Sequence, residues 1–435
     1  MDNQTGDIIL SGVKLVGHSD DGPIDIKIES GVITEIGTEI HPGNCSVLDF
    51  EGKLVSPGWM DMHVHLREPG YEHKETIKTG CDAAAFGGFT AVACMPNTDP
   101  PIHTRDVVEF IVDRARITPV DVYPIACVSK EREGRELAEM ADLKAGGAVA
   151  FSDDGSPVQN AGLMRRALEY ASMLDCCIIN HMEDLDLNPD GHMHEGSVST
   201  RLGLPGIPAL SEDVMVARDI LISATTGGRL HVAHISTAGA VELVRRAKAD
   251  GVNVTAETCP HHFTLTDEAV EESDFSTNTK MHPPLRSADD VEAIKRGLQD
   301  GTIDAICTDH APHALFEKEV EFIAAPNGII GLETAWGLIG RELIQPGLIS
   351  VESAVQKLTE APRTILGLPI PQIAVGEPAN LTVFDATTEW TFQDTDIKSL
   401  SKNTPFIGAT MVGRAWGIYN KGRWIGATVA ASNTA

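Results

Sequence analysis

The stretch WMDMHVHLR, residues 59–67, decides how this chain folds. Its first part is mostly apolar, and its far end carries two histidines and an arginine. A short apolar run that polar residues close is typical of a buried parallel strand whose carboxyl end faces an open site. His63 and His65 are two residues apart, so on a strand both imidazoles point to the same side.

The middle of the chain repeats this pattern. Eight apolar runs cover residues 59–66, 90–95, 122–128, 148–152, 177–181, 230–234, 253–257 and 305–309. Amphipathic, helix-like stretches lie between them at residues 75–85, 105–116, 133–144, 162–174, 211–224, 238–249 and 289–299, and another follows at 333–343. Buried strands that alternate with helices predict an α/β fold, specifically a (β/α)8 TIM barrel.

Both ends of the chain are β-rich instead. Short apolar runs at residues 8–10 and 13–16 are followed by Ile24, Ile26 and Ile28, which alternate with charged residues. Alternation of this kind is typical of half-buried strands. Similar strand-like segments lie at residues 380–384, 390–392, 410–412 and 416–419. We therefore expect a small β-sandwich domain built from both termini (residues 1–56 plus 367–435) around a barrel of residues 57–366.

Composition limits the class of protein. The chain has 435 residues, of which 42% are hydrophobic and 22% charged, enough for a sizeable core in two or three domains. Lys and Arg total 34 against 63 Asp and Glu, a formal net charge of −29. This balance argues against nucleic-acid or anionic-membrane partners, which need a basic surface. Salt screens the distant surface carboxylates over roughly 8 Å, so a local cationic pocket can still bind a small anion.

The cysteines and the N-terminus indicate a cellular compartment. The eight cysteines form no CxxC pair and lie mostly inside apolar runs, which is typical of reduced thiols in a cytoplasmic protein. The first residues lack the basic and apolar regions of a signal peptide. No uninterrupted apolar run approaches the ~20 residues that a membrane span needs.

Polar residues cluster where the apolar runs end. In a barrel the carboxyl ends of the strands form one face, so residues far apart in sequence converge there. The residues at these ends are His63, His65 and Arg67, then Asn97, Asp153 and Asp154, His181 and Glu183, His234, His261 and His262, and finally Asp309 and His313.

These residues predict a metal site. Imidazole and carboxylate groups are the usual ligands of catalytic zinc. His63 and His65 supply one metal position, and His181 with His234 fits a second. His231 competes with His234, but it lies three residues earlier with the opposite side-chain parity, so we expect His234.

Aspartates complete the site. Two neighbouring cations repel each other, so an anionic group must lie between them. Asp153 or Asp154 can supply it, and spacing alone does not decide which. Asp309 ends the last run, where a carboxylate can bind a metal and also move a proton. Metal binding lowers the pKa of water towards ~7, so a pair of metals favours hydrolysis of an amide or ester.

Each of these features alone also has a purely structural interpretation. An isolated HxH is more often a hydrogen-bonded core pair, and Asp-Asp-Gly is a common turn. Asp309 can cap a turn, and Arg67 can form a surface ion pair with Glu68 or Glu72. Their combination on one face of one barrel favours the metal site.

Several motifs resemble those of dihydroorotases in the amidohydrolase superfamily, and the resemblance extends over essentially the whole chain. The motifs are DMHVHLREPG at residues 61–70, GGFT at 87–90, MPNT at 95–98, FSDDG at 151–155, STRLGLPGIP at 199–208, HIST at 234–237 and TDHAPH at 308–313.

The resemblance implies an activity and a set of ligands. Dihydroorotases interconvert L-dihydroorotate and N-carbamoyl-L-aspartate in pyrimidine (UMP) biosynthesis with two Zn²⁺ per subunit. Many relatives bridge the metals with a carboxylated lysine, whereas this chain resembles the subgroup that uses aspartate. The resemblance assigns one zinc to His63, His65 and Asp309, the other to His181 and His234, the bridge to Asp154, and the catalytic proton transfer to Asp309.

The resemblance also implies the substrate contacts. They are His65, Arg67, Asn97, His282, His313, Asn327 and Gly328. Two of these depart from the family pattern, because His282 replaces an asparagine of the Lys-x-Asn-Pro-Pro-Leu-Arg motif and Asn327 stands where many relatives carry an aromatic residue. A glycine at 328 would let the main chain approach the substrate closely.

Alternative functions remain open on this sequence. One is another cyclic amidase, such as a hydantoinase or an allantoinase, although those usually carry the lysine bridge. Another is an inactive, dihydroorotase-like subunit that serves as a scaffold for aspartate transcarbamoylase. The resemblance further implies a homodimer, and association with aspartate transcarbamoylase is compatible with an active enzyme.

Overall fold

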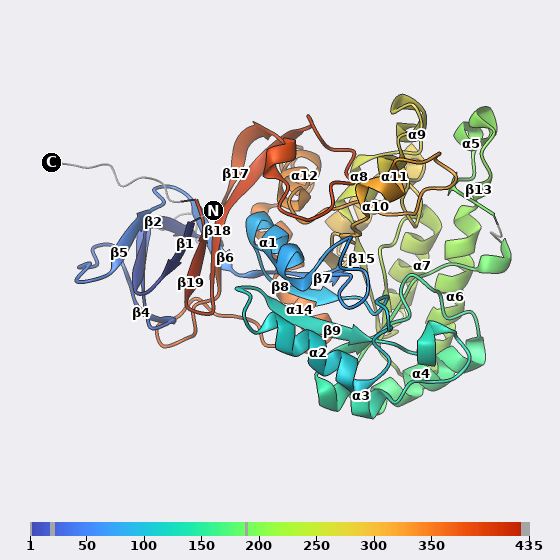
Figure 1. Cartoon of the computed structure of the whole chain (residues 1–435), viewed down its shortest axis with the longest axis horizontal. Coiled ribbons are helices and arrows are strands. Elements are labelled where there is room, and N and C mark those ends of the chain that lie inside the picture. The colour runs from blue at the N-terminus through green and yellow to red at the C-terminus, as the bar shows by residue number, and fades with distance from the viewer. Residues whose placement is uncertain (1, 18–21, 188–189, 428–435) are drawn as a thin grey trace.

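The computed structural model describes residues 2–17, 22–187 and 190–427. It consists of a barrel of parallel strands with surrounding helices, and of a mixed sheet beside it that is formed by the two ends of the chain (Figure 1). None of the described helices has the length and apolar character that crossing a bilayer requires.

The barrel strands follow the apolar runs of the sequence. In the described residues they pair in the order β16-β15-β14-β11-β10-β9-β8-β7, all in parallel. Every residue of β7 and β8 is buried, as expected for strands covered on both faces. Their bounds are β7 Trp59–Val64, β8 Phe89–Cys94, β9 Asp121–Ala126, β10 Ala150–Phe151, β11 Ile178–Asn180, β14 Leu230–Val232, β15 Val254–Thr258 and β16 Ala305–Ile306.

Contacts between β7 and the segment after β16 bring the two ends of this sheet together. The main-chain N–H of His65 donates to the carbonyl of His310 at 2.9 Å. The buried Asp61 carboxylate accepts hydrogen bonds from the N–H of Thr308 at 3.1 Å and from its hydroxyl at 2.5 Å. The barrel is thus nearly closed, and the expected (β/α)8 fold is confirmed.

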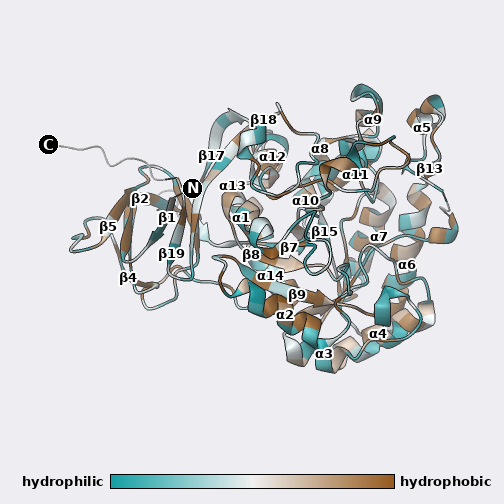
Figure 2. Cartoon of the chain, in the orientation of Figure 1, coloured by the Kyte–Doolittle hydropathy of each residue, from teal (hydrophilic) through white to brown (hydrophobic). Residues whose placement is uncertain are grey.

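Helices surround the barrel and pack their apolar sides against it. Figure 2 shows brown, apolar residues in β9 and teal, polar stretches on the surrounding helices such as α2 and α4. The helices are α1 Ile77–Gly87, α2 Arg105–Ala115, α3 Met140–Gly146, α4 Ala161–Met173, α5 Ser197–Leu202, α6 Ala209–Thr226, α7 Ala238–Ala249, α8 Pro260–Thr264, α9 Ala269–Glu272, α10 Ala288–Gln299, α11 Leu315–Lys318, α12 Ala335–Ile339, α13 Val351–Leu358 and α14 Glu360–Leu366, with a π-helical turn at Gly340–Ile344 and short strands β12 Met193–His194 and β13 Gly206–Ile207.

One expected helix is shorter than the sequence predicts. The stretch 133–144 is helical only from Met140. The preceding main chain pairs with itself, because the N–H of Lys130 donates to Glu136 and that of Ala138 donates to Val128. These hydrogen bonds replace the helical ones, so the periodicity of the side chains is not followed there.

The two ends of the chain meet in one mixed sheet. Its order is β1-β19-β18-β17-β6-β2-β3-β4, with β5 also paired to β2. The sheet bends within β2, where Gly12 adopts a φ of +74° and the register shifts between Leu10 and Val13. The strands are β1 Asp2–Thr5, β2 Ile8–Leu15, β3 Ile24–Glu29, β4 Val32–Gly37, β5 Ser46–Asp49, β6 Leu54–Pro57, β17 Leu381–Thr391, β18 Thr410–Asn420 and β19 Arg423–Gly426.

This sheet confirms that both ends form one β-rich unit. The proposed division at residues 56/57 and 366/367 stays a prediction, because contacts between the sheet and the barrel are extensive. Trp59 at the start of β7 is fully buried, and its ring lies 4.7 Å from that of Trp336 and 5.0 Å from that of Phe384. Phe384 belongs to β17, so this aromatic cluster joins the two parts of the molecule.

We predict that Trp59→Ala destabilises the protein strongly. Loss of a fully buried tryptophan leaves a cavity between the barrel and the mixed sheet, and the expected cost is about 3–5 kcal/mol. Denaturant-induced unfolding followed by circular dichroism measures this change. Leu221→Ala on α6 is the control, because Leu221 is 69% exposed. A loss with Trp59→Ala no larger than that of the control would contradict the role of the cluster.

Candidate metal centre and substrate pocket

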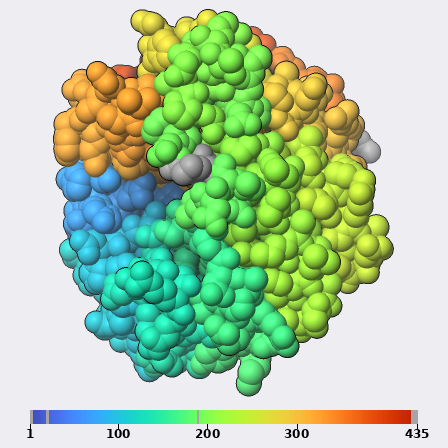
Figure 3. All heavy atoms as spheres, turned by 90° about the vertical axis from the view of Figure 1, so that its right-hand side faces the viewer, coloured from blue at the N-terminus to red at the C-terminus, as the bar shows by residue number. Residues whose placement is uncertain are grey.

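The six expected metal ligands come together at the carboxyl end of the barrel. His63 lies in β7 and His65 just beyond it, while Asp154, His181, His234 and Asp309 each follow the end of their own strand. All six side chains are buried, each at most 5% exposed. Viewed from the right-hand side of Figure 1, the surface is hollowed near its centre, where the blue, green and orange parts of the chain meet (Figure 3).

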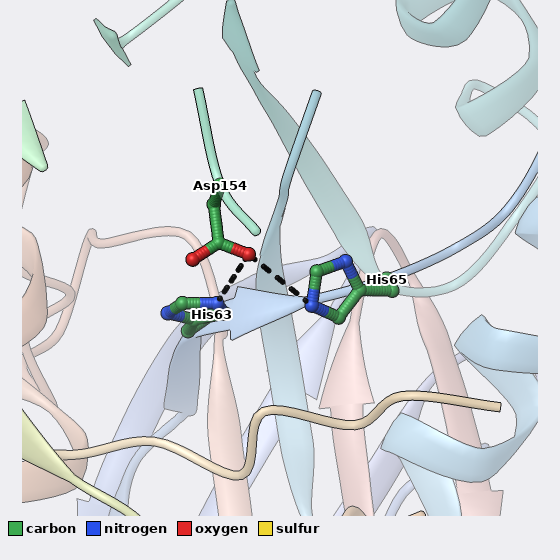
Figure 4. A group of neighbouring side chains, drawn as sticks. All are labelled: His63, His65 and Asp154. Atoms are coloured by element: carbon green, nitrogen blue, oxygen red, sulfur yellow. Dashed lines mark ion pairs between the residues drawn. The ribbon is translucent and has the colours of Figure 1, made fainter. Parts of the chain in front are cut away.

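Asp154 lies between His63 and His65. Its Oδ2 atom is 3.5 Å from Nε2 of His63 and 3.6 Å from Nε2 of His65 (Figure 4). Asp309 approaches the same two rings, with its Oδ1 2.9 Å from Nε2 of His65 and 3.7 Å from Nε2 of His63. These four side chains form the first part of the cluster.

The other oxygen of Asp154 faces a second pair of histidines. Its Oδ1 lies 3.3 Å from Nε2 of His234 and 3.6 Å from Nδ1 of His181. These two ring nitrogens are themselves only 3.0 Å apart. One carboxylate therefore presents one oxygen to each pair of imidazoles, which is the arrangement that a bridging ligand needs.

The structure distinguishes the alternatives that spacing left open. Asp153 points away from the histidines, and its Oδ1 accepts hydrogen bonds from the main-chain N–H groups of Val128 at 2.9 Å and Ser129 at 3.0 Å. His231 lies deeper in the barrel, where its Nδ1 is 2.8 Å from the hydroxyl of Thr255. Asp154 and His234, in contrast, face the cluster.

Neighbouring side chains fix which ring nitrogens carry protons. Nδ1 of His63 lies 2.7 Å from Oε1 of Glu257, and Nδ1 of His65 lies 2.8 Å from the amide oxygen of Asn97. Since these oxygens only accept hydrogen bonds, both Nδ1 atoms must donate. In the neutral rings the Nε2 lone pairs then point at the carboxylates of Asp154 and Asp309.

Lone pairs that face carboxylate oxygens in a buried site require a cation between them. Nε2 of His63 has no hydrogen-bond partner among the described residues, although it is fully buried. Five groups of described residues are close enough to share one ion. Two of them have Asp154 in common, namely His63, His65 and Asp154, and Asp154, His181 and His234. Imidazole with carboxylate is a donor set for zinc and similar divalent metals. The residues present therefore fit a divalent metal site.

The electrostatics of the cluster agree with this demand for positive charge. Burial acts to lower the pKa of His63, but Asp154 and Glu257 outweigh it and raise the pKa well above its usual value. Burial would raise the pKa of Asp154, yet the neighbouring His63, His181 and His234 hold it well below its usual range. The carboxylate of Asp154 is therefore ionised at neutral pH.

Two carboxylates of the site had no predicted role. Glu257 accepts from His63, and Glu183 lies 3.6 Å from Nε2 of His181. Carboxylates in this position orient metal-binding histidines and set their tautomers. The signal for Glu257 was present, because a charged residue that ends a buried apolar run needs a partner.

The expected substrate residues line one cavity next to the cluster. Its volume is about 520 Å³, and it contains all seven expected contacts: His65, Arg67, Asn97, His282, His313, Asn327 and Gly328. Gly328 has a φ of +154°, and a Cβ atom there would lie 2.5 Å from the carbonyl oxygen of Ala311. Only glycine therefore lets this loop come so close to the segment after β16.

Arg67 supplies a buried cation to this cavity. It is 8% exposed, and its Nε donates to the carbonyl of Pro312 at 3.2 Å. Burial lowers its pKa to about 10, so the guanidinium remains charged at neutral pH. A buried guanidinium is suited to a carboxylate ligand, because its planar fork donates two parallel hydrogen bonds.

Two histidines of the cavity are bonded to protein groups. Nε2 of His313 lies 2.9 Å from the carbonyl of Asn327, and burial together with the cations Arg67 and Lys74 lowers the pKa of His313 far below its usual value. Nε2 of His282 lies 2.6 Å from Oε2 of Glu183, and its ring stacks on that of His181 with centroids 5.0 Å apart. His282, which replaces the asparagine of the family motif, is therefore held in place by the carboxylate of Glu183.

Comparison with known proteins places this geometry in a family. Residues 52–240 match the family described as Dihydro-orotase-like. The dihydroorotase of Syntrophus aciditrophicus is 52% identical over 412 residues, which cover 94% of this chain and 96% of that protein. The dihydroorotase of Pelotomaculum thermopropionicum is 53% identical over 399 residues, which cover 92% of this chain and 93% of the relative.

Solved structures share the fold at lower identity. The L-hydantoinase (dihydropyrimidinase) from Arthrobacter aurescens superposes with a TM-score of 0.83 at 23% identity, covering 98% of this chain and 97% of that one. The dihydropyrimidinase from Brevibacillus agri superposes with a TM-score of 0.84 at 22% identity, covering 97% of this chain and 95% of that structure. These structures establish the fold, and the sequence relatives establish the closer kinship: the chain belongs to the dihydroorotase family of metal-dependent cyclic amidohydrolases.

Proposed function

We propose that the chain interconverts L-dihydroorotate and N-carbamoyl-L-aspartate in pyrimidine biosynthesis, and that it does so with two Zn²⁺ ions per subunit. The observation that carries the two-metal proposal is the position of Asp154, whose two oxygens face two separate pairs of imidazoles. The names of the relatives, at about half identity over nearly the whole chain, support the substrate.

Each ion has its own set of ligands in this proposal. His63, His65 and Asp309 would bind one, His181 and His234 the other, and Asp154 would contact both. When bound, the ions would supply Lewis acidity and a water molecule of lowered pKa. The exclusion of solvent around the ligands strengthens these electrostatic effects.

Residues of the chain orient the substrate in the cavity. Arg67 would pair with the carboxylate of dihydroorotate through two N–H groups. The amide oxygen of Asn97 is bonded to His65, so its NH₂ group is the part that would contact the substrate. His313, Asn327 and Gly328 border the same end of the cavity. Orientation by several fixed groups lowers the entropic part of the barrier.

Asp309 would move the proton. Its carboxylate takes the proton from the attacking water and delivers it to the ring nitrogen that leaves. Burial would raise the pKa of Asp309, but the contacts with His65 and His63 lower it, so the group is ready to act as a base. The product carries one more carboxylate than the substrate, so low pH favours ring closure and high pH favours hydrolysis.

The alternative activities have less support. The hydantoinase structures share the fold alone, whereas the dihydroorotase relatives are about twice as similar in sequence. A scaffold subunit without activity would not need the complete set of ligands that converges here. A cytoplasmic location, which the eight free thiols support, a homodimer and association with aspartate transcarbamoylase remain proposals.

We expect chelator-stripped protein to be inactive and to regain dihydroorotate hydrolysis as zinc approaches two ions per chain. Metal content is counted by mass spectrometry while turnover of dihydroorotate, hydantoin and allantoin is measured in parallel. Full activity with no bound metal would contradict the proposed chemistry, and preference for hydantoin or allantoin would contradict the proposed substrate.

Substitutions at His234 and His231 give this experiment a matched pair, in which His231 is the control. His234→Gln should lose one metal and the activity with it. His231→Gln should keep both metals, because His231 is equally buried but faces Thr255 and, at 3.5 Å, the Oε2 atom of Glu257, whose other oxygen bonds His63.

We predict that Asp309→Asn retains the fold and lowers kcat by about 10²–10⁴-fold, since an amide is unable to accept the proton. Stopped assays at saturating substrate measure kcat, and the metal content of the variant is counted at the same time. The exposed Asp175→Asn serves as a control. A near-normal kcat in Asp309→Asn would eliminate Asp309 as the group that moves the proton.

We predict that His282→Ala raises KM for dihydroorotate about tenfold, the value of one lost hydrogen bond, with little change in kcat. His282→Asn should have a KM close to that of the unmodified enzyme, because the amide of asparagine both donates and accepts and thus keeps a hydrogen-bonding group in the cavity. Initial-rate kinetics on both variants decide the matter. Equal KM values for the alanine variant and the unmodified enzyme would remove His282 from the substrate contacts.

A further inference from the structure

The loop that carries Asn327 and Gly328 has an unusual set of supports. Residues 319–328, between α11 and α12, form no regular helix or strand. Within the segment only the carbonyl of Glu321 accepts from the segment's own N–H groups, those of Ala324 and Ala325, so other donors must satisfy the remaining carbonyls where they are buried. Since the loop borders the cavity beside the metal cluster, the groups that satisfy those carbonyls also determine the shape of the cavity.

Four consecutive carbonyls of this loop meet four side chains from elsewhere. Lys280 Nζ donates to Ala325 at 2.8 Å, and Lys318 Nζ donates to Pro326 at 2.8 Å. The next two carbonyls, of Asn327 and Gly328, are bonded to Nε2 of His313 at 2.9 Å and to Nδ2 of Asn403 at 3.0 Å.

The two lysines each bind a second carbonyl as well. Lys280 Nζ donates to Ile323 at 2.9 Å, and its own main-chain carbonyl accepts from the N–H of Gly328 at 2.9 Å. Lys318 Nζ donates to the carbonyl of Thr277 at 2.9 Å. The lysines therefore link the loop to the segment 277–282, which contributes Met281 and His282 to the same cavity.

Both lysine side chains are costly to bury. Lys280 is 4% exposed and Lys318 is 6% exposed, and neither forms an ion pair within the described ranges. Burial lowers the pKa of Lys280 to about 8 and that of Lys318 to about 7. An apolar residue of similar length would avoid this desolvation cost. The presence of the two lysines is explained if the main-chain carbonyls of the loop need hydrogen-bond donors.

We propose that Lys280 and Lys318 are positioning residues, which set the conformation of the substrate-binding loop by donating to its main-chain carbonyls. This proposal rests on the proposed function, because it takes Asn327 and Gly328 to border the bound substrate. The lysines themselves line no part of the cavity. They act through the main chain of the loop, so their loss should affect substrate binding more than the chemical step.

A third buried lysine provides a matched control. Lys357 in α13 is 8% exposed, and its Nζ donates to the carbonyl of Ile303 at 2.6 Å. Ile303 precedes β16 and thus lies at the opposite end of the barrel from the cavity. The same substitution at Lys357 removes a buried ammonium and a lysine–carbonyl hydrogen bond without touching the loop.

The test compares Lys280→Met, Lys318→Met and Lys357→Met in the zinc-loaded protein. The two loop variants should raise KM for dihydroorotate about tenfold or more, with a smaller change in kcat and unchanged metal content. Lys357→Met should lower the melting temperature but leave KM unchanged. A KM within about twofold of the unmodified enzyme in both folded loop variants, or an equal rise in Lys357→Met, would overturn the proposal.

A second measurement does not depend on the substrate. Hydrogen exchange followed by mass spectrometry should show faster exchange of residues 319–329 in the two loop variants and no change there in Lys357→Met. If the unmodified protein fails to turn over dihydroorotate, the proposed function is wrong, and exchange alone decides the role of the lysines. Should the methionine variants not fold, Lys280→Leu and Lys318→Leu, which also lack a donor, take their place with the same criteria.

Discussion

The buried carboxylate of Asp154 is the constraint on which the site depends. Four imidazole rings approach it, and their ring nitrogens face its two oxygens in a region closed to solvent. A buried anion surrounded by lone pairs is stable only if positive charge is shared among these groups. Protons can supply that charge in part, but the geometry of two imidazole pairs around one carboxylate matches two metal ions better. The barrel brings the ends of β7, β11, β14 and β16 around the aspartate that follows β10.

Groups behind the ligands make this arrangement specific. Glu257 lies below the cluster and accepts a hydrogen bond from Nδ1 of His63 at 2.7 Å. Asn97, just after β8, accepts one from Nδ1 of His65 at 2.8 Å. Each fixes a ring tautomer, so that the other nitrogen is available as a ligand. Asp61 acts one level further out, because it joins Thr308 to β7 and thereby sets the distance between His63 and Asp309. The site is thus supported by polar groups that the barrel buries at a cost in desolvation.

Much of this arrangement could be predicted from the sequence, and the reasons are physical. Buried parallel strands appear as short apolar runs, and the polar residues that close them share one face, so the barrel and the ligand positions follow together. Glu257 was counted only as the end of a run, because sequence does not show which histidine it faces. Lys280 was noted only as the first residue of a motif and Lys318 not at all, since a main-chain carbonyl acceptor has no sequence signal. The helix expected at 133–144 failed before Met140 because main-chain pairing there overrides side-chain periodicity.

Three functional residues just beyond the strand ends have strained backbone conformations. Arg67, His234 and Asp309 have φ values of 62°, 29° and 45°, in the left-handed region that side-chain-bearing residues rarely adopt. Such conformations cost about 1–3 kcal/mol each and persist only where surrounding contacts determine them. All three residues lie two or three positions beyond the end of a strand, where an abrupt turn directs the side chain over the barrel mouth instead of outward. The contacts of the nearly closed barrel below them are what maintain this strain, so the packed strands and the strained strand ends form one functional unit.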